Sequence, residues 1–144
     1  MFLEDLKSGI RTRNVEEMDA IAKNFAACCP LSCFLALHGD LGSGKTAFVK
    51  GLGRAWNIDD VKSPSFNIVD FHLGQRRLAH VDAYRLDKAN LDYFGLEDFL
   101  IPPFCLAVEW PEKLEGLIDF DFQLYFSIVG ACHQIQWKPN VGRN

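Results

Sequence analysis

The sequence predicts an α/β protein, a three-layer sandwich in which helices enclose a sheet of both parallel and antiparallel strands. The run 33–37 is continuously apolar and is followed by a glycine-rich segment and by helical periodicity over 46–56. Residues 104–110, which open with the apolar run 104–108, predict another buried strand. Continuous apolar runs are typical of parallel strands buried on both faces, whereas two predicted hairpins require antiparallel pairs, so we expect a mixed sheet.

Length and charge restrict the domain count and the partners. The 144 residues with 49% hydrophobic content fit a single domain spanning 1–144. The formal net charge of −4 argues against a broad electrostatic surface for nucleic acid. We therefore expect any contact with RNA to be indirect, through a protein partner.

The cysteines and the termini indicate the compartment. The five cysteines are odd in number and show no Cys-x-x-Cys pair or zinc-type histidine spacing, and we interpret them as reduced core residues: Cys28, Cys29, Cys33, Cys105 and Cys132. Charged residues interrupt the N-terminal segment, and no apolar run reaches membrane-spanning length. These features predict a cytoplasmic protein without a membrane contact.

The first predicted helix begins after Asn14. Asn14 is a suitable N-cap, with Glu17 as its reciprocal partner, and the helix should end before Pro30. Helical spacing places four residues on one buried face: Met18, Ile21, Phe25 and Cys28.

The remaining elements follow from alternation and turn residues. Segments 65–72 and 77–82 predict a hairpin with a turn at 74–76. A short helix is expected over 91–100, ended by the two prolines at 102 and 103. A second hairpin is predicted from strands 122–129 and 132–137 around Gly130.

The segment from Gly39 to Thr46 carries the clearest chemical signal. It reads Gly-Asp-Leu-Gly-Ser-Gly-Lys-Thr and fits the pattern of glycine, four residues, glycine, lysine and serine or threonine. Glycines let successive backbone N–H groups point inward around a phosphate. Lys45 can reach the outer phosphates, Thr46 offers a hydroxyl to Mg²⁺, and the helix that starts here directs its positive end at the same anion. The pattern, between a buried strand and a helix, predicts a P-loop NTPase-like fold.

Two acidic residues are candidates for the metal and the reaction. Asp82 ends the strand 78–81, and Glu109 ends the strand 104–108. Ligands of open α/β sheets lie beyond the carboxyl ends of parallel strands, where both side chains would emerge beside Thr46. Both could therefore serve a magnesium site. His80, inside an apolar strand, fits a packed or hydrogen-bonded residue better than a general base.

Four segments occur together in the order seen in one known family. They are 39–46, then Ser-Pro-Ser-Phe at 63–66, then His-Val-Asp-Ala-Tyr-Arg-Leu at 80–86, then Glu-Trp-Pro-Glu at 109–112. In these segments the chain resembles the TsaE (YjeE) family, small bacterial ATPases required for threonylcarbamoyladenosine modification of tRNA. The resemblance covers nearly the whole chain, from about Asn14 to the last hairpin.

The resemblance implies a role for each matching residue. The triphosphate cradle would consist of Leu41, Gly42, Ser43, Gly44, Lys45, Thr46 and Ala47. Glu109 would complete the metal shell, and Asp82 would position or activate the attacking water. Ser63 and Ser65 would lie in a switch-like loop that senses the γ-phosphate, and Trp110 would pack near the nucleotide. Lys45 and Asp82 are thus the catalytic candidates.

The resemblance also implies the biological setting. It predicts an Mg²⁺-dependent ATPase that binds the TsaD–TsaB pair, couples ATP hydrolysis to turnover of that complex, and is slow alone. Adenine preference rests on the resemblance, in agreement with the lack of an Asn-Lys-x-Asp motif. The chain departs from the family pattern at Met18, where threonine is common, and more mildly at Ser43 and Ser65.

Two other functions share these motifs. A small-molecule kinase would use the same phosphate loop but needs an acceptor pocket and usually a basic lid. A nucleotide-dependent binding switch without productive hydrolysis would share every motif. Kinetics are needed to separate these alternatives from an ATPase.

Overall fold

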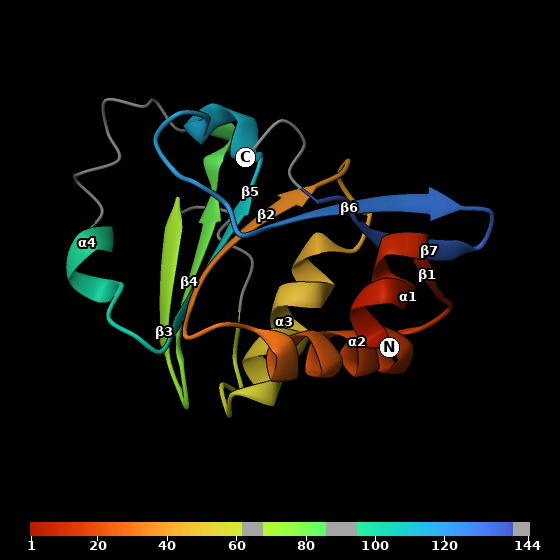
Figure 1. Cartoon of the computed structure of the whole chain (residues 1–144), viewed down its shortest axis with the longest axis horizontal. Helices are drawn as coiled ribbons and strands as arrows, with labels where there is room; N and C mark the ends of the chain where they lie inside the picture. Colours follow the sequence, from red (N-terminus) through yellow and green to blue (C-terminus); the bar gives the residue numbers. More distant parts are fainter. Residues whose placement is uncertain (62–67, 86–94, 140–144) are drawn as a thin grey trace.

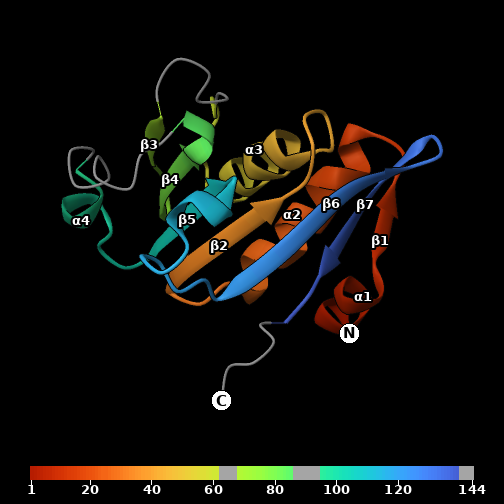
Figure 2. The same cartoon turned by 90° about the horizontal axis from the view of Figure 1, so that it is seen from above.

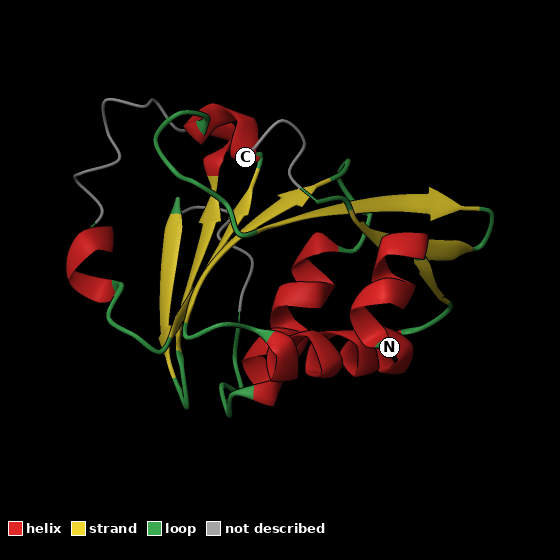
Figure 3. Cartoon of the chain, in the orientation of Figure 1, coloured by secondary structure: helices red, strands yellow, loops and turns green. Residues whose placement is uncertain are grey.

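The computed structural model describes residues 1–61, 68–85 and 95–139, and within them the strands form one twisted sheet (Figure 1). Its order is β1-β7-β6-β2-β5-β4-β3. The strands are β1 (Ile10–Thr12), β2 (Ser32–His38), β3 (Val69–Leu73), β4 (Arg77–Asp82), β5 (Phe104–Glu109), β6 (Phe122–Val129) and β7 (Cys132–Trp137). The sheet mixes parallel centre and antiparallel edges, as predicted, and Figure 3 shows how it separates the helices.

The parallel strands β4, β5, β2 and β6 form the centre of the sheet. Strand β2 pairs in parallel with β5 on one side and with β6 on the other, and β5 also pairs in parallel with β4. All six residues of β5 are buried, which explains why its first five residues are apolar. The predicted hairpins form the antiparallel pairs β3–β4 and β6–β7.

Three helices cover one face of this sheet: α1 (Phe2–Ser8), α2 (Val15–Cys28) and α3 (Lys45–Ala55) (Figure 2). Between them and the sheet lies the larger hydrophobic cluster, in which Phe25 of α2 and Phe48 of α3 meet edge to face with ring centroids 5.7 Å apart. Helix α3 therefore sits firmly on the sheet, and its first residue follows the glycine-rich loop.

Short elements cover the opposite face. They are η1 (Ala83–Arg85), α4 (Leu96–Phe99) and η3 (Pro111–Leu114). A second cluster that includes Val81, Val108 and Leu114 is buried beneath them. The predicted three layers are therefore present, with the second helical layer reduced to single turns.

The N-terminal cap of α2 is confirmed with one change. The Asn14 side chain accepts a hydrogen bond from the Glu17 backbone N–H at 2.9 Å. The Glu17 carboxylate accepts from the backbone N–H of Arg13 at 2.7 Å, one residue before the cap. This bond, with that from the Arg13 side chain, lowers the pKa of Glu17.

Several expectations need correction. Cys28 is exposed although Met18, Ile21 and Phe25 are buried, because the helix ends there and the chain turns away towards β2. The interpretation of all five cysteines as core residues is likewise wrong, since only Cys33 and Cys105 are buried.

Element boundaries also differ at the edges. Helix α1 and strand β1 were not predicted, and β1 extends the sheet by pairing antiparallel with β7. The first strand of the β3–β4 hairpin begins at Val69, and α4 covers Leu96–Phe99 of the expected helix over 91–100. Positions 65–67 and 91–94 lie outside the described residues. In the described part of the chain no helix has the length and apolar character needed to cross a membrane.

Candidate functional site

The loop between β2 and α3 is shaped by its glycines. Gly39 has a φ of 147° and Gly44 a φ of 111°, values that residues with a Cβ rarely adopt. A Cβ built on Gly39 would lie 2.5 Å from the carbonyl oxygen of Phe126 on β6. The loop therefore lies directly against the sheet, and only glycine fits at its first position.

Side chains from distant elements support this loop from outside. Met18 of α2 is buried, and its Cε would lie 3.0 Å from a Cβ built on Gly44. His133 on β7 hydrogen-bonds through Nε2 to the carbonyl oxygen of Gly42 at 3.2 Å. Position 18, where the resemblance described above leads us to expect threonine, is thus occupied by a methionine whose thioether packs against the loop.

The first turn of α3 leaves hydrogen-bond donors available. Gly44 is its N-cap, and no side chain of the described residues caps it. The Ser43 hydroxyl is also buried without a hydrogen-bond partner among these residues. Uncapped N–H groups at the positive end of a helix, together with a glycine loop, form a ready anion site.

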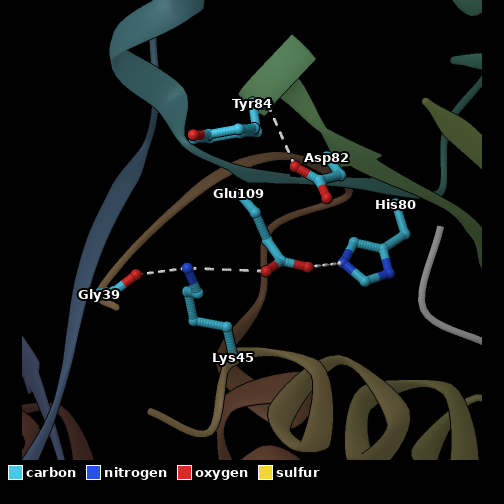
Figure 4. A network of polar contacts seen from close by, with 6 residues as sticks. All are labelled: Gly39, Lys45, His80, Asp82, Tyr84 and Glu109. Atoms are coloured by element: carbon cyan, nitrogen blue, oxygen red, sulfur yellow. Dashed lines mark hydrogen bonds and ion pairs between the residues drawn. The ribbon is translucent and has the colours of Figure 1, made fainter. Parts of the chain in front are cut away.

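Lys45 lies at the centre of the site (Figure 4). Its side chain is 5% exposed, and its ammonium group donates a hydrogen bond to the carbonyl oxygen of Gly39. The same nitrogen lies 3.7 Å from Oε1 of Glu109 and 4.9 Å from the centre of the Trp110 ring. The ammonium group is therefore held at the mouth of the loop by a carbonyl, a carboxylate and an aromatic face.

Glu109 joins this lysine to a buried histidine. Its second carboxylate oxygen, Oε2, lies 2.7 Å from Nε2 of His80, whose side chain is fully buried. A carboxylate in its ionised form can only accept hydrogen bonds, so this contact with an ionised Glu109 would require the proton on Nε2 of His80. The hydrogen bond expected for His80 is confirmed, but the sequence did not indicate that its partner is the candidate metal ligand.

Asp82 lies beside Glu109 because their strands are in register. Asp82 of β4 is the direct partner of Glu109 of β5. Residues i and i+2 of a strand share a face, so Asp82 leaves β4 on the same face of the sheet as His80. Asp82 Oδ1 accepts a hydrogen bond from the backbone N–H of Tyr84 at 3.1 Å, and its side chain is only half-buried.

Trp110 closes one side of the site. Its backbone φ of 58° is left-handed, which turns the chain sharply after β5 into η3. Its ring meets that of Tyr84 at a centroid distance of 5.1 Å, close to edge-on. The aromatic pair thus joins the chain segments that follow β4 and β5.

The structure brings together most of the residues expected in the site. Lys45, Asp82, Glu109 and Trp110 converge at the carboxyl ends of β4 and β5, next to the loop. Two members of the expected cradle could offer only backbone groups to a phosphate, because the Leu41 side chain is 95% exposed and that of Ala47 packs against the larger hydrophobic cluster. Ser63 and Ser65 lie outside the described residues.

The donor set suits a phosphate bound together with a hard cation. Thr46, Asp82 and Glu109 could supply the oxygen ligands that Mg²⁺ prefers, and the loop, the α3 amides and Lys45 could act as donors for phosphate oxygens. The unpartnered Ser43 hydroxyl and the glycine positions that exclude a Cβ are further features of an anion cradle.

A parallel-centred sheet with this loop between its central strand and a helix is a P-loop NTPase-like fold. The family model described as threonylcarbamoyl adenosine biosynthesis protein TsaE matches residues 12–136. The chain belongs to the TsaE family.

Individual relatives agree with this assignment. The chain is 39% identical over 105 residues to the tRNA threonylcarbamoyladenosine biosynthesis protein TsaE of Synechocystis, covering 69% of this chain and 67% of that protein. It is 33% identical to the protein of the same name from Borreliella burgdorferi, covering 86% and 94% of the two chains. The crystal structure of Bacillus subtilis YdiB superposes with a TM-score of 0.74 at 32% identity, covering 91% of this chain and 84% of that one.

Proposed function

We propose that this protein is an Mg²⁺-dependent ATPase that acts in tRNA threonylcarbamoyladenosine biosynthesis. The observation that carries the proposal is the position of Lys45, whose buried ammonium group lies between the loop carbonyl of Gly39 and the carboxylate of Glu109. Lys45 is buried in the first turn of α3, which no side chain of the described residues caps, so it is well placed to bind phosphate oxygens. Membership of the TsaE family supports the assignment to threonylcarbamoyladenosine biosynthesis.

ATP binding would redistribute the contacts of Lys45. Its ammonium group would exchange the Gly39 carbonyl for the β- and γ-phosphate oxygens, while the loop and α3 amides hold the remaining oxygens. Glu109 would keep its hydrogen bond to His80 and turn its other oxygen to the metal with Thr46. Bound Mg²⁺ would offset the charge that develops on the phosphates.

Asp82 is the residue proposed to act on the attacking water. It lies beside Glu109 on the adjacent strand, and its carboxylate is more exposed than that of Glu109. Among the described residues this half-buried carboxylate accepts a backbone hydrogen bond from Tyr84, and its second oxygen could accept one from water and orient it. It could also complete the metal shell.

We further propose that the protein works with TsaD and TsaB. The family resemblance implies that it binds their complex and couples ATP hydrolysis to its turnover, with tRNA contacted only through these partners. The net charge of −4 is compatible with an indirect role towards RNA. Hydrolysis is expected to be slow until the partners order the site.

The test is phosphate release from ATP and GTP with Mg²⁺, measured for the protein alone and with its cognate TsaD and TsaB. Asp82→Asn is the informative variant, because it keeps the shape and removes the charge. We expect hydrolysis of ATP that rises with the partners, and a fall of about 100-fold in Asp82→Asn with ATP binding retained.

Other outcomes would identify the alternatives. ATP binding that tightens the partner complex without any phosphate release would replace the ATPase by a nucleotide-dependent binding switch. Transfer of phosphate to an added small-molecule acceptor would indicate a kinase. Equal hydrolysis by the parent protein and Asp82→Asn would remove Asp82 from the reaction.

A further inference from the structure

Three cysteines that are separate in the sequence converge at one point of the fold. Cys29 follows α2, Cys33 lies near the start of β2, and Cys105 lies near the start of β5. Their three sulfur atoms lie within 4.8 Å of one another. All three are free thiols, two of them buried and Cys29 half-buried.

Sheet register and a short turn create this cluster. Cys33 and Cys105 are direct partners in the parallel pair β2–β5, so their side chains leave the sheet on the same face. The turn between α2 and β2 is also bonded to β5, because the backbone N–H of Phe104 donates to the carbonyl oxygen of Leu31 at 2.8 Å. The backbone around the cluster is thus held by the sheet.

A buried arginine lies beside the sulfurs. Arg76 donates from Nη2 to the carbonyl oxygen of Cys29 and from Nη1 to that of Phe104, both at 3.3 Å. Its guanidinium group also lies 4.9 Å from the centre of the Trp56 ring. A positive charge is therefore held against the carbonyl groups that border the three thiols.

The thiols already share their protons unequally. Hydrogen bonds from Cys105 and Cys33, with the charge of Arg76, lower the pKa of the Cys29 thiol to about 4. The hydrogen bonds to Cys29, together with burial, raise the pKa of Cys105. The thiolate is the form in which cysteine binds a metal ion, so the lowered pKa of Cys29 is compatible with a ligand role.

We propose that Cys29, Cys33 and Cys105 form a binding site for a thiophilic divalent cation, Zn²⁺, with water as the fourth ligand. Tetrahedral Zn²⁺ with bonds of about 2.3 Å places its sulfur ligands about 3.8 Å apart, so the cluster needs only a small contraction. Three thiolates and Zn²⁺ carry a net charge of −1, which the Arg76 guanidinium offsets. Binding releases the protons still held by the thiols.

Cys29 is the member of the cluster through which an ion could enter. It is half-buried, whereas Cys33 and Cys105 are completely buried. A water ligand on the solvent side would complete the tetrahedron. Soft thiolate ligands favour zinc over Mg²⁺, which the oxygen donors of the other site prefer.

The two sites are separate in the fold. Cys33 and Cys105 lie at the starts of β2 and β5, whereas Gly39 and Glu109 follow or end the same strands at the opposite edge. Zinc would join the turn after α2 to the centre of the sheet. Its expected effect is on stability, and it is independent of the proposed ATPase activity.

Cobalt is a suitable spectroscopic probe for this site. Reduced, chelator-treated full-length protein is titrated with Co²⁺, and Zn²⁺ is then added in competition. We expect a thiolate-to-cobalt charge-transfer band that saturates at one ion per chain and is lost on addition of Zn²⁺. Zn²⁺ should also raise the midpoint of thermal unfolding.

Variants assign the ligands. Cys29→Ser changes a half-buried residue. Loss of a residue that only supports a metal ligand typically weakens metal binding about 10- to 100-fold, so we expect loss of the ligand Cys29 to weaken Zn²⁺ binding by more than about tenfold. Cys132→Ser, also half-buried but outside the cluster, is the matched control and should bind as the parent does. Far-ultraviolet circular dichroism is used to check that both variants are folded.

Clear results would overturn the proposal. One is the absence of a thiolate-to-cobalt band in the fully reduced parent protein. Another is a band that persists unchanged in folded Cys29→Ser. Equal loss of Zn²⁺ binding in Cys132→Ser would place the ion elsewhere.

Discussion

His80 and Glu109, on neighbouring parallel strands, share a hydrogen bond of 2.7 Å between Nε2 and Oε2. The other oxygen of the same carboxylate lies 3.7 Å from the ammonium group of Lys45. One glutamate therefore connects a fully buried histidine to the lysine of the phosphate loop. Since metal-ligating carboxylates depend on such outer partners for orientation, we expect His80 to act as a positioning residue for the candidate metal site.

Replacing His80 tests this positioning role. We expect His80→Leu to weaken Mg²⁺-dependent ATP binding by about 10- to 100-fold, because Glu109 loses the donor that orients it. His80→Gln should recover part of the loss, since its amide N–H can donate. The measurement is ATP affinity as a function of Mg²⁺ concentration. His72→Leu changes a histidine of the neighbouring strand β3 and is the control, and an equal loss there would indicate a structural effect only.

Replacing Lys45 tests the phosphate contact. Lys45→Met keeps most of the apolar side chain and removes the charge, and we expect ATP affinity to fall by about 10- to 100-fold. Lys50→Met makes the same change at an exposed position of the same helix and should bind ATP as the parent does. Binding can be followed by fluorescence of a labelled nucleotide. Equal affinities of the two variants would contradict the role of Lys45.

Replacing Gly39 tests the shape of the loop. Gly39→Ala introduces a Cβ 2.5 Å from the Phe126 carbonyl oxygen at a φ of 147°. We expect a loss of about 1–3 kcal/mol in the free energy of unfolding from the backbone conformation, and a further loss from the clash. Gly42→Ala also has a positive φ, but its Cβ would meet nothing within 4 Å, so it should lose less. Denaturant unfolding of both variants gives the comparison.

The cap of α2 predicts a dependence of stability on pH. The backbone N–H and side chain of Arg13 lower the pKa of Glu17 in the folded protein. This contribution is therefore present above the pKa of Glu17 in the unfolded chain and is lost as the pH falls through the lowered folded value. We expect Glu17→Gln to be less stable than the parent near pH 7 and to lose less stability on acidification.

Thermal unfolding measured between about pH 7 and pH 3 checks this expectation. Glu16→Gln, in the same first turn, controls for removal of an acidic charge near the helix N-terminus. A parallel shift of the parent and Glu17→Gln across the whole range would show that Glu17 does not contribute in this way.

Local sequence was sufficient for the elements whose signal is short-range. The apolar runs of β2 and β5, the cap at Asn14 and the turn at Gly130 each predicted the element that the structure contains. The short N-terminal elements were missed: α1 carries one fully buried residue, Leu6, and β1 has three residues that acquire a sheet partner only from the far end of the chain. Such strands carry too few residues for an alternating pattern.

The sequence by itself predicted the candidate phosphate loop, because the spacing within eight residues sets which backbone and side-chain groups could face an anion. It also indicated Asp82 and Glu109, since the end of an apolar strand is a local feature. Only the tertiary structure decided that His80 donates to Glu109, that Met18 packs against Gly44, and that three cysteines meet at the opposite edge of the sheet. These relationships depend on strand order and register, which arise from burying both faces of one sheet and which no short segment encodes.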